Sequence, residues 1–282
     1  NSFRIFVYRL CPSFSTLPSF RIFVYRLCPY FLTLPSASSF TGRSTSLQRE
    51  FIHRIVGGTP ARIEEYPFAV TLQRSGFQYC GGAILNEEWV LTAAHCTDAV
   101  PSGFQVVSGV TDKYDGSATK TYATVFQHED YDDWTLENDI SLLKLASPLT
   151  LGDTQAPIPT ATVTDFTYGD LTVVGWGTTT EGGQTSRDLL QVSVPFVDDE
   201  TCKAYYEGEV VADSMMCAGE AGKDACQGDS GGAVVNDLGD GGPYEHVGIV
   251  SWGTGCARER YPTVYTETAY FNQWINEQMA RA

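Results

Sequence analysis

The chain has 282 residues and a formal net charge of −16; 43% of its residues are hydrophobic and 12% aromatic. This length allows one large domain or two small ones, and the composition supports a substantial core and argues against bulk disorder. The apolar runs are far shorter than the roughly 18 residues that span a bilayer, so we expect no membrane-spanning segment.

The charge is distributed unevenly along the chain. Residues 1–54 carry seven arginines and a single acidic residue, Glu50, whereas the rest carries 11 basic and 33 acidic residues. A body this acidic repels nucleic acids and anionic lipid surfaces. We therefore expect neither nucleic acid nor a membrane as a partner, and we interpret the acidic excess mainly as a source of solubility.

The N-terminal region is a tandem repeat. Residues 2–18 read SFRIFVYRLCPSFSTLP and residues 19–35 read SFRIFVYRLCPYFLTLP. Two copies are too few for a solenoid, and arginines and prolines interrupt the apolar runs, so no clean signal peptide is present. Residues 36–54 are rich in Ser and Thr and predict a linker. We interpret residues 1–54 as a leader or pro-segment that is absent from the mature protein.

A different pattern starts at Ile55. Short β-branched and aromatic stretches alternate with Gly, Asn, Asp and Pro, which predicts many short strands and an all-β barrel or sandwich. The predicted strands are 68–73, 82–85, 89–92, 104–108, 140–145, 171–175, 190–194, 248–252 and 263–266.

A helix is predicted at the end of the chain, over 268–280. Thr268 is a suitable N-cap. The apolar residues that follow recur at helical spacing and predict a stripe packed on the core: Tyr270, Phe271, Trp274, Ile275 and Met279.

Eight cysteines stand at positions 11, 28, 80, 96, 202, 217, 226 and 256. None forms a C-x-x-C pair, which argues against a zinc ribbon or a thioredoxin-type redox site. An even count in an acidic, glycine-rich chain favours disulfides and an oxidising compartment. The count alone leaves the connectivity open. We leave Cys11 and Cys28 out of the core framework because they lie in the repeat.

The segment 223–232, which reads KDACQGDSGG, carries the most chemical information. It places Ser230 among glycines that let the backbone turn tightly and approach a ligand. Asp229 directly precedes the serine, Asp224 lies six residues upstream of it, and Cys226 stands between the two carboxylates. The pattern indicates an exposed nucleophile with backbone N–H donors beside it and a carboxylate nearby that reads charge.

A serine nucleophile needs a base that takes its proton and a carboxylate that orients the base. Of the four histidines, His53 lies in the linker, and His128 and His246 have neighbours typical of a surface. His95 differs because it follows a predicted strand and precedes Cys96. His95 is therefore the candidate base.

Five motifs together resemble the trypsin/chymotrypsin family of serine proteases. TAAHC at 92–96, NDI at 138–140 and GDSGG at 228–232 resemble its three active-site motifs and follow its order. IVGG at 55–58 resembles its mature N-terminus, and SWG at 251–253 its substrate-binding strand. The resemblance covers residues 55–282.

This resemblance implies an all-β fold of two six-stranded antiparallel β-barrels, over about 55–160 and 161–266, with a C-terminal helix and the active site between the barrels. It also implies the catalytic roles. Ser230 attacks the scissile carbonyl, His95 is the general base, and Asp139 orients the His95 ring. The N–H groups of Gly228 and Ser230 bind the oxyanion.

The resemblance implies three disulfides: Cys80–Cys96, Cys202–Cys217 and Cys226–Cys256. It implies no cofactor and no metal, and Asp112 and Asp115 alone are weak calcium ligands. We expect a secreted, monomeric enzyme whose partners are protein or peptide substrates, protein protease inhibitors and an activating protease.

Activation is expected at the Arg54–Ile55 bond. Cleavage frees the Ile55 α-amine, whose charge can pair with Asp229 inside the protein and order the neighbouring loop. The chain is therefore predicted to be an inactive zymogen until it is cut after Arg54.

Asp224 falls where trypsins carry the acid of the primary specificity pocket, which favours Arg or Lys before the scissile bond. Ser251, Trp252 and Gly253 form the substrate-binding strand, and Gly253 leaves one wall open. Thr263, however, stands where trypsins carry glycine, and elastase-like members narrow the pocket with a bulky residue there. A broad or elastase/chymotrypsin-like specificity is the alternative to trypsin-like cleavage, and a non-catalytic homologue that acts as a binding module is the alternative of another class.

Overall fold

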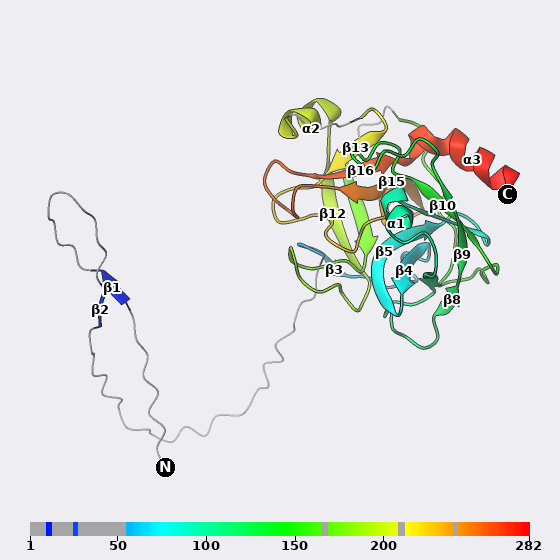
Figure 1. Ribbon diagram of the computed structural model, residues 1–282, viewed down its shortest axis with the longest axis horizontal. Helices are drawn as coiled ribbons and strands as arrows, with labels where there is room; N and C mark the ends of the chain where they lie inside the picture. The colour runs from blue at the N-terminus through cyan, green and yellow to red at the C-terminus, as the bar shows by residue number, and fades with distance from the viewer. Residues whose placement is uncertain (1–9, 13–24, 28–54, 165–168, 208–211, 240–241) are drawn as a thin grey trace, which may run out of the picture. The chain divides into compact units, whose positions relative to one another are not determined.

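The computed structural model describes residues 10–12, 25–27, 55–164, 169–207, 212–239 and 242–282 (Figure 1). Residues 1–50 and 51–282 form two compact units. In the first unit, β1 (Leu10–Pro12) pairs antiparallel with β2 (Tyr25–Leu27), with Cys11 opposite Arg26. The rest of the repeat, Cys28, the predicted linker with His53, and Arg54 lie outside the described residues.

In the second unit, the first sheet has the strand order β8-β7-β4-β5-β6-β10-β9. Its pairings are antiparallel, and Tyr122 alone separates β8 from β9, the two ends of the order, so the sheet curls until its ends meet at this residue. The strands are β4 (Ala69–Arg74), β5 (Phe77–Ile84), β6 (Trp89–Thr92), β7 (Gln105–Ser108), β8 (Thr119–Thr121), β9 (Ala123–Gln127) and β10 (Ser141–Leu145).

The second sheet has the order β11-β14-β15-β16-β13-β12-β3, and an additional β11–β12 pairing closes six of its strands into a barrel. Figure 1 shows these strands beside the first sheet within the same unit. The strands are β3 (Thr59–Pro60), β11 (Asp170–Gly175), β12 (Leu190–Val197), β13 (Met215–Ala218), β14 (Ala233–Asp237), β15 (Tyr244–Trp252) and β16 (Thr263–Glu267). The predicted all-β class is confirmed, with six strands of this sheet closed into a barrel and the first sheet forming a half-barrel.

The sequence pattern of β12 explains why this segment forms a barrel strand. Leu190, Val192 and Val194 are buried, whereas Ser193 between them is exposed. Successive side chains of a strand point to opposite faces, so this alternation turns one face to the barrel interior. Burial of each such aliphatic side chain contributes about 1.5–3 kcal/mol.

Helices cover little of the described chain: α1 (Ala94–Ala99), α2 (Asp199–Tyr205), the 3-10 turn η1 (Thr268–Phe271) and α3 (Asn272–Arg281). In the described residues, no helix is long and apolar enough to cross a membrane. Phe271 and Ile275 are buried and Trp274 and Met279 pack against the same core, as the predicted stripe requires.

Three details of the sequence-based prediction are wrong. The α-helix begins at Asn272, because residues 268–271 form a 3-10 turn that changes the phase of the stripe and leaves Tyr270 55% exposed. Thr268 caps no helix, since its hydroxyl hydrogen-bonds the His246 ring at 2.8 Å. His246 is completely buried, although its sequence neighbours are typical of a surface.

Candidate active site

His95 and Asp139 come from neighbouring elements of the first sheet. His95 lies in the first turn of α1, directly after β6, and Asp139 lies two residues before the start of β10. β6 and β10 pair with Thr92 opposite Ser141. This register brings the Asp139 side chain to the start of α1.

Asp139 is fully buried and holds His95 at two points. Its Oδ1 accepts the His95 backbone N–H at 2.8 Å, and its Oδ2 lies 2.7 Å from His95 Nδ1. Ser251 Oγ donates to the same Oδ2 at 2.5 Å, and Thr266 Oγ1 donates to the Asp139 carbonyl at 2.9 Å. A carboxylate only accepts, so His95 Nδ1 donates to Asp139, and in the neutral ring the lone pair lies on Nε2.

Ser230 lies in the loop between β13 and β14, and this loop is attached to both sheets. The Ser230 carbonyl accepts from Gly81 N–H of β5 at 2.7 Å, and Gly231 N–H donates to the Val250 carbonyl of β15 at 2.8 Å. Gly231 has a φ of +75°, and a Cβ there would lie 2.3 Å from Thr92 Oγ1 and 3.1 Å from Cys96 Sγ. Only glycine lets the serine loop lie this close to the turn that carries His95.

The N–H groups of Gly228 and Ser230 have no hydrogen-bond acceptor among the described residues. Unpaired N–H groups beside a serine are the arrangement that an oxyanion hole needs.

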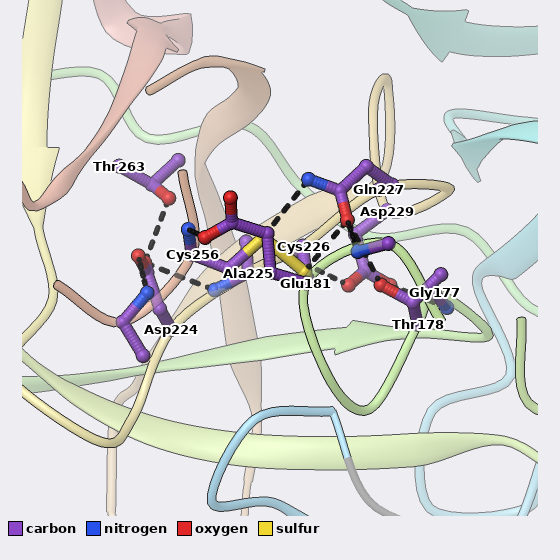
Figure 2. The surroundings of a disulfide bond; sticks show 12 residues. Gly177, Thr178, Glu181, Asp224, Ala225, Cys226, Gln227, Asp229, Cys256 and Thr263 are labelled. Carbon is purple, nitrogen blue, oxygen red and sulfur yellow. Dashed lines mark hydrogen bonds between the residues drawn. A yellow bond between two sulfur atoms is a disulfide. The ribbon is translucent and has the colours of Figure 1, made fainter. Parts of the chain in front are cut away.

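Disulfides brace the segments around the serine. The described residues contain three, Cys80–Cys96, Cys202–Cys217 and Cys226–Cys256, the same pairs that the family resemblance implies. The first joins β5 to α1 beside His95. The third joins the serine loop to the segment after β15 (Figure 2).

Asp229 directly precedes Ser230 in the serine loop, and its side chain is buried. Its Oδ1 accepts from Gly177 N–H at 2.8 Å and its Oδ2 from Cys226 N–H at 3.0 Å (Figure 2). Burial raises the pKa of Asp229 to about 7, and these two hydrogen bonds oppose the rise. Ile55 is also completely buried, in the core of the second sheet. A nearby cation would therefore stabilise the charged form of this buried carboxylate.

A cavity of about 220 Å³ opens beside Ser230. The predicted specificity residues Ser251, Trp252, Gly253 and Thr263 all line it. A Cβ added at Gly253 would lie 3.6 Å from Thr263 Oγ1, so the two residues form adjoining walls and glycine keeps the passage between them open.

Asp224 does not line this cavity but lies directly behind its wall, 1% exposed. Its Oδ1 accepts from Thr263 Oγ1 at 2.7 Å and from Ala225 N–H at 3.0 Å, and its Oδ2 accepts from Ala257 N–H at 2.9 Å (Figure 2). Burial raises the pKa of Asp224 to about 6, and the Thr263 hydroxyl is the first of the hydrogen bonds that oppose it.

No set of side chains in the described ranges forms a convincing metal site. The cluster Cys80, His95 and Cys96 has its two sulfurs in a disulfide, so it offers no thiolate. Asp112 is engaged by Arg187 through two hydrogen bonds, and Asp115 accepts from its own turn at Ser117.

Comparisons with known proteins identify a family over the residues that form both sheets. Residues 55–275 match the family model described as Trypsin. Trypsin-1 of Astacus astacus is 44% identical over 234 residues, which cover 78% of this chain and 98% of that protein. Trypsin 5G1 of Aedes aegypti is 40% identical (79% and 84% covered), and Trypsin alpha-4 of Lucilia cuprina is 39% identical (79% and 86% covered).

The chain belongs to the trypsin family. It is therefore a serine endopeptidase, and the predicted family and enzyme class are confirmed. Trypsin-family proteases act on protein substrates and are bound by protease inhibitors.

Sequence reasoning missed some of the contacts in this trypsin-family site. Ser251 was predicted only as a substrate-binding residue, yet its hydroxyl also holds Asp139. Thr266 was not predicted to have a role at the site. Its partner Asp139 lies far away in the chain, so local patterns carry no signal for it.

Proposed function

We propose that this trypsin-family protease cleaves protein and peptide chains after Arg or Lys, with His95, Asp139 and Ser230 as its catalytic residues. The buried Asp224 carboxylate behind the cavity wall supports this specificity more than any other observation. A basic side chain in the cavity offsets the cost of burying that charge. The Thr263 hydroxyl uses its proton to donate to Asp224. The lone pairs of the hydroxyl oxygen therefore remain free to accept from an ammonium or guanidinium group in the cavity.

The proposed reaction uses the proton positions fixed by Asp139. His95 Nε2 takes the Ser230 proton as Oγ attacks the scissile carbonyl, and the Gly228 and Ser230 N–H groups bind the oxygen that becomes negative. His95 then protonates the amine that leaves as the peptide bond breaks. Water next attacks the acyl-enzyme carbonyl while His95 Nε2 takes its proton, and His95 returns this proton to Ser230 Oγ as the ester bond breaks. Asp139 stabilises the imidazolium that forms.

The specificity is tested with peptides that carry Arg, Lys, Phe, Leu or Ala before the scissile bond. We expect Arg and Lys peptides to be cleaved best, and Asp224→Ser to lower kcat/KM for them by about 10²-fold while changing the Leu peptide little. Thr263→Gly should increase cleavage of the Arg peptide, because the widened passage lets the guanidinium reach Asp224 itself and this gain exceeds the loss of the hydroxyl acceptor. A preference of the unmodified enzyme for Ala or Leu would support the elastase-like alternative, which the walls formed by Gly253 and Thr263 make the second candidate.

Activation by cleavage at Arg54–Ile55 is the regulatory part of the proposal. A free Ile55 amine would give the buried Asp229 a directly paired cation, in addition to the charge of Lys113, and would stabilise the serine loop. The mature, secreted and monomeric enzyme would then begin at Ile55, after an activating protease has removed residues 1–54. We expect an uncut Arg54→Gln protein to be inactive, and N-terminal sequencing of the active form to start at Ile55; full activity of the uncut variant would refute this part.

A non-catalytic homologue is separated from an enzyme by an organophosphorus serine reagent. The cut protein should be labelled once per chain at Ser230, and a Ser230→Ala variant should not be labelled. If the folded, cut protein does not react, the assignment of Ser230 is wrong.

A further inference from the structure

Lys113 is completely buried, which is rare for lysine unless the ammonium is fully partnered. It lies in the loop between β7 and β8, where a lysine normally lies in solvent. Its Nζ donates to Gln78 Oε1 at 2.7 Å and to Thr185 Oγ1 at 2.8 Å. Both of these partners lie against the serine loop, so Lys113 joins three segments that are far apart in the chain.

Gln78 carries the first connection to the oxyanion hole. Its Oε1 accepts from Lys113 while its Nε2 donates to the Gly228 carbonyl at 2.9 Å. The ammonium therefore fixes which end of the Gln78 amide faces Gly228, because only the oxygen end can accept from Lys113.

Thr185 carries the second connection. It pairs with Thr178 as a β-bridge, and Thr178 N–H donates to the Gln227 carbonyl at 2.8 Å (Figure 2). In a trans peptide the carbonyl and the following N–H point in opposite directions. Holding the Gln227 carbonyl on Thr178 therefore turns the Gly228 N–H away from Thr178.

Both peptide groups that flank the Gly228 Cα are thus held in place. One is held by Thr178 and the other by Gln78. Lys113 bonds to Gln78 directly and to Thr185, the bridge partner of Thr178. Glycine here has a φ of +92°, and it imposes little preference of its own on these two peptide planes. Within the loop, Asp229 N–H donates to the Cys226 carbonyl at 2.9 Å, and contacts from outside the loop supply the rest of that order.

We propose that Lys113 is a positioning residue of the oxyanion hole, which orients the Gly228 N–H through Gln78 and Thr185. The inference rests on the proposed role of Gly228 and adds the residue that maintains it. Burial lowers the pKa of Lys113 to about 8, and the charges of Asp229 and Asp112 oppose the fall. The side chain is therefore an ammonium at neutral pH, and its hydrogen bonds are the stronger, charge-assisted kind.

The test compares Lys113→Met and Gln78→Glu with the unmodified protein, all cut after Arg54. Loss of one oxyanion donor lowers kcat by about 10²–10³-fold, and a donor that is only misaligned should cost a part of this, about 10–10². We expect kcat to fall by that factor in both variants while KM changes less than about twofold. Gln78→Glu keeps an acceptor for Lys113 but removes the donor to Gly228, so it tests the connection without removing the cation.

A peptide aldehyde and the matching peptide amide separate positioning from general damage. The aldehyde forms a tetrahedral adduct whose oxygen occupies the oxyanion hole, whereas the amide binds without one. The aldehyde should bind more weakly by the same factor as kcat, and the amide should bind unchanged. Lys203→Met is the matched control, because Lys203 lies in an exposed ion pair with Asp213, and its kcat should stay unchanged.

Equal weakening of aldehyde and amide, or a lower melting temperature with unchanged kcat, would overturn the proposal. If Lys113→Met does not fold, Gln78→Glu decides alone. Hydrogen exchange of the peptide 225–232 gives a readout that does not need activity, and it should be faster in both variants. If the unmodified protein does not react with the serine reagent, the catalytic assignment fails, and the exchange data still report whether Lys113 orders this loop.

Discussion

The two halves of the active site are held by different means. His95 and Asp139 lie where α1 and β10 meet, and a strand register with four hydrogen bonds to Asp139 fixes them. Ser230 lies in a loop that depends on glycines, a disulfide and buried charges. The regular half should therefore respond mainly to changes in its chemistry, and the loop half to changes in its supports.

The largest effect is expected in the regular half. Asp139→Asn keeps the size of the side chain and the strand register, but an amide can donate to His95 Nδ1 and stabilise the wrong tautomer. We expect kcat to fall about 10⁴-fold with little change in thermal stability, as measured by peptide hydrolysis and calorimetry. A large loss of stability would show that Asp139 holds the two sheets together as well as orienting His95.

Removing disulfides tests the loop half. Replacing Cys226 and Cys256 by Ala, or Cys202 and Cys217 by Ala, should cost about 3–4 kcal/mol of unfolding free energy in either case. The two disulfides span sequence separations of 30 and 15 residues, and the stabilisation depends only weakly on loop length. Only the first pair supports the serine loop, so only that variant should lose activity per folded molecule, by about tenfold or more.

The measurement is kcat per active site, titrated with the serine reagent, together with urea unfolding. Equal activities of the two double variants would contradict the view that the serine loop depends on its own supports, since the Cys202–Cys217 bridge braces α2 against β13 and joins no residue of the serine loop.

Much of this architecture could be predicted from the sequence. The short β-branched and aromatic stretches, separated by turn-forming residues, predicted the all-β class. The motifs around His95, Asp139 and Ser230 predicted the family and the segments that meet at the site. These features are encoded by residues that are close together in the chain.

Burial of the polar residues could not be predicted in the same way. Lys113 and His246 both have polar or turn-forming neighbours, and each is buried because of partners that lie tens of residues away, Gln78 and Thr185 for the lysine and Thr268 for the histidine. The same reason explains Ser251, whose contact with Asp139 depends on how the second sheet packs against the first.

His246 gives the smallest of the expected effects, and it concerns stability. Its ring is buried on β15, Nδ1 is bonded to Thr268, and Nε2 has no partner among the described residues. Burial lowers its pKa to about 3, against about 6.5 in the unfolded chain. The unfolded state therefore binds more protons between pH 3 and 6.5, and this contribution to stability is lost as the pH falls through that window.

Asp224 and Asp229 act in the opposite direction, because their pKa values of about 6 and 7 lie above those of the unfolded chain. They favour folding as the pH falls from 7 to 4, and they can hide the effect of His246 in the unmodified protein.

A comparison with His246→Gln cancels the contribution of the two aspartates to the pH dependence, since both proteins contain them. The unfolding free energy of the unmodified protein should fall by about 3 kcal/mol relative to this variant between pH 7.5 and pH 4. Urea titrations at both pH values measure the difference, and His128→Gln, at a partly exposed ring, should show a much smaller one. A difference in unfolding free energy that does not change with pH would mean that water reaches the His246 ring. The second sheet around β15 would then open more readily than the burial of His246 indicates.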